Sequence, residues 1–280
     1  MTDVDSDIPS HLHNLIDTIV KKRNLMKNYQ LKVRNPLKPG DNWLGVVLEI
    51  QVISDEPENE PFNFIAKLAP TGKVQRNFFP IRLSYEFEIY AYTKILPELI
   101  KLQTENNVRN IFDPFAKCYQ TLLSDGQETL VLENMCKHGY KPFDNRHPVE
   151  LRHASLIMTA LGKLHALSFV LKNQRPELFK EISLKIENSF FHSNYGKVFI
   201  KITQNIGKQV LNRLTKNEIA HKSFENFLKD PSFVIDKLLK SEAAGKYAVI
   251  CHGDAQTRNM LFKYKVSTYF EFLEFVVKKF

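Results

Sequence analysis

The residues best suited to chemistry lie near the end of the chain, in the stretch 249–262. An apolar run leads into His252-Gly253-Asp254, four residues follow, and Asn259 then precedes a second apolar run. This pattern is typical of a strand, a tight loop and another strand, with the loop carrying polar groups out of a packed core. Its glycine allows a sharp turn. The alternative interpretation is an ordinary hairpin loop rich in polar residues.

The spacing of Asp254 and Asn259 matches the kinase catalytic loop H-R-D-x-x-x-x-N, with Gly253 at the position of the arginine. In that chemistry the aspartate accepts or orients the proton of the substrate hydroxyl. The asparagine oxygen holds a Mg²⁺ ion on the nucleotide phosphates. The spacing therefore favours Asp254 as a catalytic residue and Asn259 as a metal ligand.

Such a loop needs a second element that binds phosphates, and the segment 61–68 is predicted to be a strand that provides it. Its end, Phe64-Ile65-Ala66-Lys67, has the form of the kinase V-A-I-K. A lysine is costly to bury unless it meets a carboxylate or a phosphate, although a strand-end lysine can instead extend to water. The partner we expect is Glu88, on a helix over 84–96. Glu86 is the competing candidate, and we expect it to point to solvent.

The elements before this strand predict an antiparallel sheet, with a helix over 9–27 and strands over 29–33 and 43–53. The loop between the two strands lies where a kinase has its phosphate-covering turn. We expect the backbone amides of Asp41, Asn42 and Gly45 to meet phosphate oxygens there. The loop lacks a complete glycine-rich motif, so a simple hairpin remains the alternative.

A second hairpin is predicted over 115–133, and its second strand continues as an almost wholly apolar run to Met135. Polar and irregular residues follow. We therefore predict a hinge between two lobes, with adenine bound by backbone groups near Glu133 and Met135. The first lobe comprises residues 1–135. The second, residues 136–280, changes to a helical period, beginning with a long helix over 153–170.

Composition supports a soluble globular protein, because 43% of the 280 residues are hydrophobic and 25% are charged. We expect no membrane association, since no apolar run is judged long enough to cross a bilayer and the acidic N-terminus does not resemble a signal peptide. Cys118, Cys136 and Cys251 lie in apolar surroundings and are predicted to be reduced core thiols. This favours a cytoplasmic location.

The net charge of +8 is compatible with attraction of anionic nucleotides, and it is spread along the chain. Its tight basic clusters are not interleaved with aromatic residues, so we expect no nucleic-acid partner. The sequence has neither the closely spaced histidines and cysteines of a zinc site nor a G-x-S-x-G nucleophile motif. Phosphotransfer by a monomer is the interpretation that the residues favour.

Several segments together resemble one known family. They are His252-Gly253-Asp254, 259–262, 130–135, 88–97, Gly40-Asp41-Asn42, 64–67 and 160–168. This combination resembles the ecdysteroid kinase-like (CHK kinase-like) family, which is related to choline kinases and aminoglycoside phosphotransferases. The resemblance covers most of the chain. It implies an α+β, two-lobed protein kinase-like fold, ATP and Mg²⁺ as cofactors, and phosphorylation of a small-molecule hydroxyl, with ecdysteroids and related steroids as candidate substrates.

One departure from that family concerns the metal site. The family has a later Asp-Phe-Gln whose aspartate binds Mg²⁺, whereas no aspartate follows Asp254 in this chain. Glu274 could substitute for it, and an unrelated tail is the alternative. The sequence therefore leaves open an active kinase, a nucleotide- or ligand-binding relative with impaired catalysis, and a truncated fragment.

Overall fold

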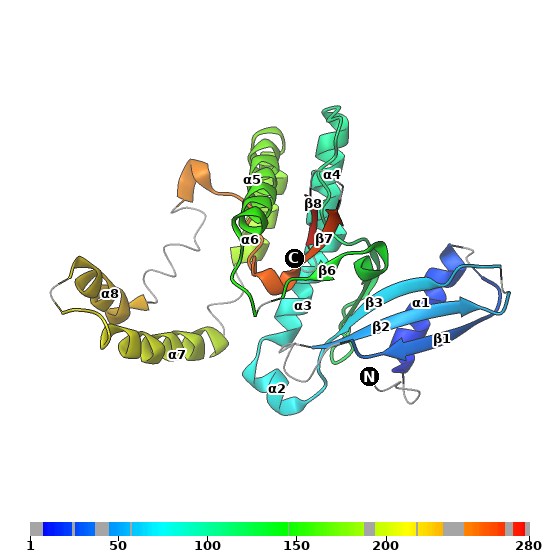
Figure 1. The fold of residues 1–280 in the computed structure, drawn as a ribbon, viewed down its shortest axis with the longest axis horizontal. Helices are drawn as coiled ribbons and strands as arrows, with labels where there is room; N and C mark the ends of the chain where they lie inside the picture. The colour runs from blue at the N-terminus through cyan, green and yellow to red at the C-terminus, as the bar shows by residue number, and fades with distance from the viewer. Residues whose placement is uncertain are drawn as a thin grey trace.

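The fold is described by a computed structural model (Figure 1). The structure describes residues 8–23, 26–36, 45–56, 58–144, 146–187, 194–216, 218–231, 244–266 and 271–277. The predicted phosphate contacts Asp41 and Asn42 lie outside these ranges.

The first part of the chain forms a five-stranded sheet in the order β1-β2-β3-β5-β4, with every neighbouring pair antiparallel. The strands are β1 (Tyr29–Arg34), β2 (Val46–Ser54), β3 (Phe62–Leu68), β4 (Cys118–Leu122) and β5 (Thr129–Glu133). The helix α1 (Ser10–Lys22) covers one face, and its buried stripe includes Leu12, Ile16 and Ile19. The predicted strands are therefore present, and the first helix ends earlier than the predicted residue 27.

The other face of the sheet is covered by a second helical layer. After the short helix α2 (Lys73–Phe78), the chain forms α3 (Ile81–Tyr90), a π-helical turn η1 (Ala91–Ile95) and α4 (Leu96–Glu105). Leu130 and Leu132 of β5 pack against α3, whereas Val131 packs on the side of α1. Because side chains alternate along a strand, β5 is buried on both faces, which explains its almost wholly apolar sequence.

The remaining elements are mostly helical. They are η2 (Met135–His138), β6 (Lys141–Pro142), α5 (Leu151–Gln174), α6 (Pro176–Glu187), α7 (Asn194–Leu211), α8 (Ile219–Lys229), η3 (Gly245–Tyr247), η4 (Thr257–Asn259), β7 (Met260–Val266) and β8 (Glu271–Val277). The strands form an antiparallel sheet in the order β6-β7-β8. Leu99 and Leu102 of α4 pack with Leu164 and Leu171 of α5, so the helices on both sides of the predicted hinge share a core.

The helix α5 is long and apolar enough to cross a membrane, judged by length and composition alone. Its most apolar 18-residue window has a mean hydropathy of 1.6, which corrects the expectation that no run reaches this length. One such helix does not identify a membrane protein, because the core helix of a soluble protein passes the same test. Here α5 buries Ile157, Leu164 and Leu171 against neighbouring elements, whereas Leu151 and Met158 are exposed.

The cysteines also depart from expectation. None of the three is in a disulfide, but Cys136 and Cys251 are exposed and Cys118 is only partly buried. The prediction of core thiols is therefore wrong for Cys136 and Cys251. Each lies where an apolar run gives way to a polar loop, and the exposed side of such a junction cannot be recognised from composition alone.

Candidate active site

Lys67 lies near the end of β3, opposite Val47 of β2 and Leu130 of β5. Phe64, Ala66 and Leu68 are part of the core on the side of α1. Alternation along the strand therefore directs Lys67 to the opposite face, where α3 lies. The lysine side chain is thus brought under the helix that was predicted to carry its partner.

The expected ion pair between Lys67 and Glu88 is present. The Nζ of Lys67 donates to Oε1 of Glu88, and the residues are only 8% and 4% exposed, respectively. Removing either partner would leave a buried charge without compensation, which is strongly destabilising. Glu86, which we expected to point to solvent, instead pairs with Lys185 of α6 at 3.0 Å. The helix therefore directs Glu88 toward the sheet and Glu86 toward α6.

Gly45 lies immediately before β2, at the end of the predicted phosphate-covering loop. A Cβ atom at this position would lie 2.4 Å from Oη of Tyr85 and 2.6 Å from the carbonyl oxygen of Leu68. The glycine is therefore required for a close approach between this segment and α3. Tyr85 was not recognised from the sequence, because its contact with Gly45 joins segments 40 residues apart. A role of Gly45 in binding phosphate stays a prediction.

The predicted hinge has an ordered backbone. The side-chain oxygen of Asn134 accepts from the amide of Cys136 at 3.1 Å, and the carbonyl oxygen of Met135 accepts from the amide of Tyr140 at 3.2 Å. Met135 is the first residue of η2, so no carbonyl of that helix can accept its N–H. An amide that is not used within its helix can donate to a ring nitrogen of adenine. The adenine contacts of Glu133 and Met135 stay predictions.

The loop after residue 251 places Asp254 and Asn259 in direct contact. The carboxamide Nδ2 of Asn259 donates to Oδ2 of Asp254 at 2.7 Å and to its carbonyl oxygen at 2.9 Å. Nε2 of Gln256 donates to Oδ1 of Asp254 at 2.8 Å. Because the amide nitrogen of Asn259 is used in this way, its Oδ1 is the atom suited to a hard cation.

Two neighbours stabilise the shape of this loop. Gly253 has a φ of 81°, in the left-handed region that glycine adopts without a steric cost. The buried His252 accepts from the amide of Asp254 through Nδ1 at 3.2 Å. His252 also lines a small apolar cavity with Leu164 of α5 and Met260 of β7, so it anchors the loop against these two elements. The sequence showed this histidine within the motif but did not indicate its anchoring role.

The donor set present fits a Mg²⁺ ion only in part. Within the described ranges, no group of three or more histidine, cysteine, aspartate or glutamate residues could hold a metal. Mg²⁺ commonly binds one or two protein oxygens and completes its coordination shell with phosphates and water. Oδ1 of Asn259 would be such a protein oxygen. Glu274 lies opposite Lys263 on β8, whereas Val277 lies opposite Met260 beside the loop. The backbone register therefore places Glu274 three residues away from the strand end nearest Asn259.

The structure thus assembles two pairs of predicted site residues. Lys67 with Glu88 lies between the first sheet and α3, and Asp254 with Asn259 lies on the loop before β7. The convergence of both pairs on one nucleotide stays a prediction, as do the individual roles of these residues.

The five-stranded sheet with its lysine–glutamate pair, followed by a helical part with a polar loop, defines an α+β protein of the kinase-like class. The chain belongs to the ecdysteroid kinase-like family, whose model matches residues 39–276. That range includes both pairs of site residues. No curated protein and no solved structure matches the chain.

Proposed function

We propose that this protein transfers the γ-phosphoryl group of ATP to a hydroxyl group of a small molecule. The observation that carries the proposal is the buried ion pair between Lys67 and Glu88, in a chain of the ecdysteroid kinase-like family. A buried lysine held by a helix glutamate is the arrangement with which kinases present an ammonium group to nucleotide phosphates. The contact between Asp254 and Asn259 supports the same chemistry.

Each residue has a definite task in this proposal. Lys67 binds the phosphates and offsets negative charge in the transition state, while Glu88 keeps the lysine in place. Asp254 orients the attacking hydroxyl and takes up its proton, and Asn259 would hold Mg²⁺ through Oδ1. The N–H of Met135 donates to the adenine ring. Bound Mg²⁺ would supply further charge neutralisation on the phosphates.

The substrate we propose is a small alcohol, with ecdysteroids and related steroids as the first candidates because of the family to which the chain belongs. We further propose that the protein acts as a cytoplasmic monomer. Both statements are independent of the residue roles above, and each can fail without affecting them.

The deciding experiment compares nucleotide-dependent thermal shift with ATP turnover, each with and without Mg²⁺. We expect Asp254→Asn to abolish turnover while MgATP still stabilises the protein, and Lys67→Met to lose both. The control is Asp144→Asn, which removes an exposed carboxylate paired with Arg146. Phosphorylation that survives Asp254→Asn would disprove the assignment of this residue.

A second candidate function is nucleotide or ligand binding without catalysis. The observation that favours it is the donor set near Asn259, since the described ranges contain no group of three or more histidine, cysteine, aspartate or glutamate residues that could hold a metal. In that case MgATP would raise the melting temperature of the wild-type protein, but no substrate in a steroid panel would be phosphorylated. Detectable turnover in the same samples would exclude this alternative.

A further inference from the structure

A second buried carboxylate lies close to the start of α3. Glu128, next to β5, is 0% exposed. Arg76 of α2 binds both of its oxygens, with Nη2 2.7 Å from Oε1 and Nη1 3.1 Å from Oε2. Nη1 of Arg82, in the first turn of α3, lies 3.9 Å from Oε1. A carboxylate without solvent contact depends on such cations to remain ionised.

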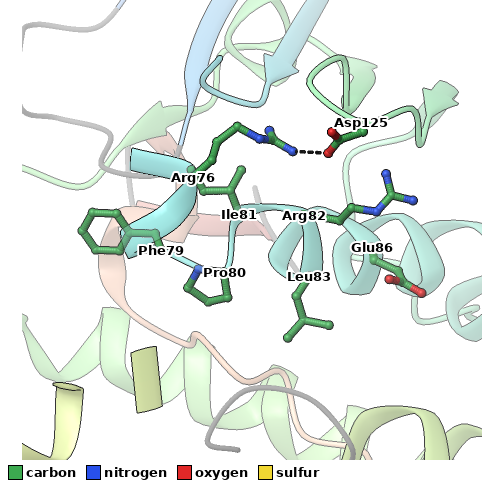
Figure 2. Close-up of a pocket in the computed structure, with 8 residues that line it drawn as sticks. All are labelled: Arg76, Phe79, Pro80, Ile81, Arg82, Leu83, Glu86 and Asp125. Carbon is green, nitrogen blue, oxygen red and sulfur yellow. Dashed lines mark hydrogen bonds and ion pairs between the residues drawn. The ribbon is translucent and has the colours of Figure 1, made fainter. Parts of the chain in front are cut away.

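Arg76 also joins segments that lie far apart in the sequence. Besides Glu128, it donates to the carbonyl oxygen of Pro70 at 3.3 Å. It also donates to Oδ1 of Asp125 at 2.8 Å, the contact drawn in Figure 2. The carbonyl oxygen of Glu128 in turn accepts from the amide of Ala69 at 2.9 Å. This polar junction therefore connects α2 to the end of β3 and to the turn between β4 and β5.

The helix α2 has little else to hold it in place. None of its residues from Lys73 to Phe78 is buried, so packing against a core contributes little to its position. The chain passes directly from α2 into α3, whose first turn carries Arg82 and has no acidic residue of its own. The negative charge of Glu128 near this helix start is favourable for the helix dipole.

The same side of α3 carries the residues of the candidate site. Tyr85 lies about one turn before Glu88 on α3, and its pKa is raised by burial and by the negative charges of Glu88 and Glu128. Tyr85 is also the residue whose hydroxyl lies against Gly45. Along α3, Arg82 approaches Glu128, Tyr85 contacts Gly45, and Glu88 binds Lys67.

We propose that Arg76 is a positioning residue, which acts through the buried carboxylate of Glu128 to fix the start of α3 and thereby the Lys67–Glu88 pair. The effect of Arg76 on catalysis rests on the proposed function, whereas its effect on the position of α3 does not. Without Arg76, the polar connection between Glu128 and the start of α3 depends on the 3.9 Å approach of Arg82 alone, and Glu88 meets Lys67 for a smaller fraction of the time.

A ligand site is the other reading of this region, because Arg76 and Arg82 line a cavity of about 340 Å³ (Figure 2). The charges in it argue against an anion. Arg76 is already neutralised by Glu128 and Asp125, and Arg82 approaches the same Glu128 carboxylate. We therefore assign the arginines to the junction, and we expect inorganic phosphate to leave amide hydrogen exchange in residues 81–90 unchanged.

The test uses Arg76→Met with Arg34→Met as its matched control. Arg34 binds the buried carboxylate of Glu49 at 2.5 Å, and Glu49 retains Lys137 at 3.1 Å when the arginine is removed. Each variant thus takes one guanidinium from a buried carboxylate that keeps a second cation. The measurements are amide hydrogen exchange of residues 81–90 and the rate of Lys67 acetylation, followed by mass spectrometry under native conditions.

We expect Arg76→Met to accelerate both rates by about tenfold or more, because local opening then exposes α3 and the lysine. Arg34→Met should leave both rates within about twofold of the wild type. Wild-type rates in Arg76→Met, or an equal acceleration in Arg34→Met, would overturn the proposal. If Arg76→Met does not fold, Glu128→Gln provides the second variant, with the same direction of change expected.

Nucleotide kinetics separate this inference from the proposed function. If the wild type turns over ATP, Arg76→Met should raise the KM for ATP by about tenfold, and Arg76→Lys should restore part of the loss because it keeps the charge. An unchanged KM would contradict the proposal. If the wild type binds no nucleotide, the proposed function fails, while exchange and acetylation still decide the role of Arg76.

Discussion

At the scale of single residues, the Cys118 thiol lies close enough to the lysine–glutamate pair to report on its charge. Burial and the negative charge of Glu88 raise the pKa of Cys118 to about 12, with Lys67 acting in the opposite direction. Because only the thiolate is nucleophilic, this cysteine has an ionised fraction of about 10⁻⁴ at pH 8. An ordinary thiol is ionised to about one quarter at that pH.

We predict that iodoacetamide modifies exposed Cys136 readily at pH 8 and leaves Cys118 almost unmodified. The rate at Cys118 should rise about tenfold per pH unit up to at least pH 10, as its thiolate fraction increases. Peptide mapping after timed alkylation measures both rates, with the urea-unfolded protein as the control in which they become equal. A plateau at Cys118 below pH 10 would contradict the raised pKa.

Gly45 provides the second residue-scale prediction. Gly45→Ala should lower the free energy of unfolding by about 1–3 kcal/mol, because the added methyl overlaps both Tyr85 and the Leu68 carbonyl. Adding Tyr85→Phe should recover only part of the loss, since the backbone carbonyl remains. Urea titration measures these changes.

The control for this prediction is Gly162→Ala, on α5. A Cβ atom there meets nothing within 4 Å, so this change should stabilise the protein by up to about 1 kcal/mol through helix propensity. A neutral or stabilising Gly45→Ala would show that Gly45 does not lie this close to Tyr85 and Leu68.

At the scale of elements, His11 on α1 makes the stability of the folded protein depend on pH. Burial lowers the pKa of His11 from its usual 6.5, and its Nε2 is buried without a hydrogen-bond partner among the residues described. The unfolded chain therefore binds a proton more readily than the folded one below pH 6.5. By linkage, stability is retained above that pH and is lost as the pH falls through this window.

We predict that the wild type loses stability between pH 7 and pH 5 by up to about 1.4 kcal/mol per pH unit from this group. His11→Leu should reduce this slope, because it removes the group whose pKa burial lowers. Urea unfolding at several pH values measures the slope. Equal slopes in the wild type and His11→Leu would remove His11 as its cause.

At the scale of the whole molecule, α7 and α8 stand apart from the two sheets in Figure 1. They pack on each other, and a Cβ atom at Gly207 would lie 2.3 Å from a methyl carbon of Leu228. Several apolar residues of the pair are exposed, among them Ile206 and Ile219. Regions that bury little apolar surface open at a lower free energy than the core.

We predict that amides in α7 and α8 exchange at least about tenfold faster than those in β5 or α5. Gly207→Val should accelerate exchange in α7 and α8 further, because the larger side chain overlaps Leu228, and leave β5 unchanged. Hydrogen exchange with mass spectrometry measures all four elements together. Equal protection throughout the chain would show that α7 and α8 unfold only with the core.

Sequence reasoning worked where the determining pattern is local. The buried end of β3 and the helix glutamate predicted the Lys67–Glu88 pair, and the Asp254–Asn259 spacing predicted a polar loop before a strand. It failed for Cys136, because the exposed side of a short helical turn depends on what packs nearby. It also missed β8, whose pairing with β7 is a relation between segments that local propensity does not describe.

The sequence alone determined which residues alternate, which helices are amphipathic and which polar residues lie on the loop, since these properties depend on neighbours along the chain. Only the tertiary structure decided that Glu86 turns to Lys185, that Tyr85 meets Gly45 and that Arg76 reaches Glu128. These contacts join residues 40 to 99 positions apart. Their formation depends on how the sheet and helices pack, and at the fully buried Glu128 the energetic penalty for an unpaired charge also selects the partner.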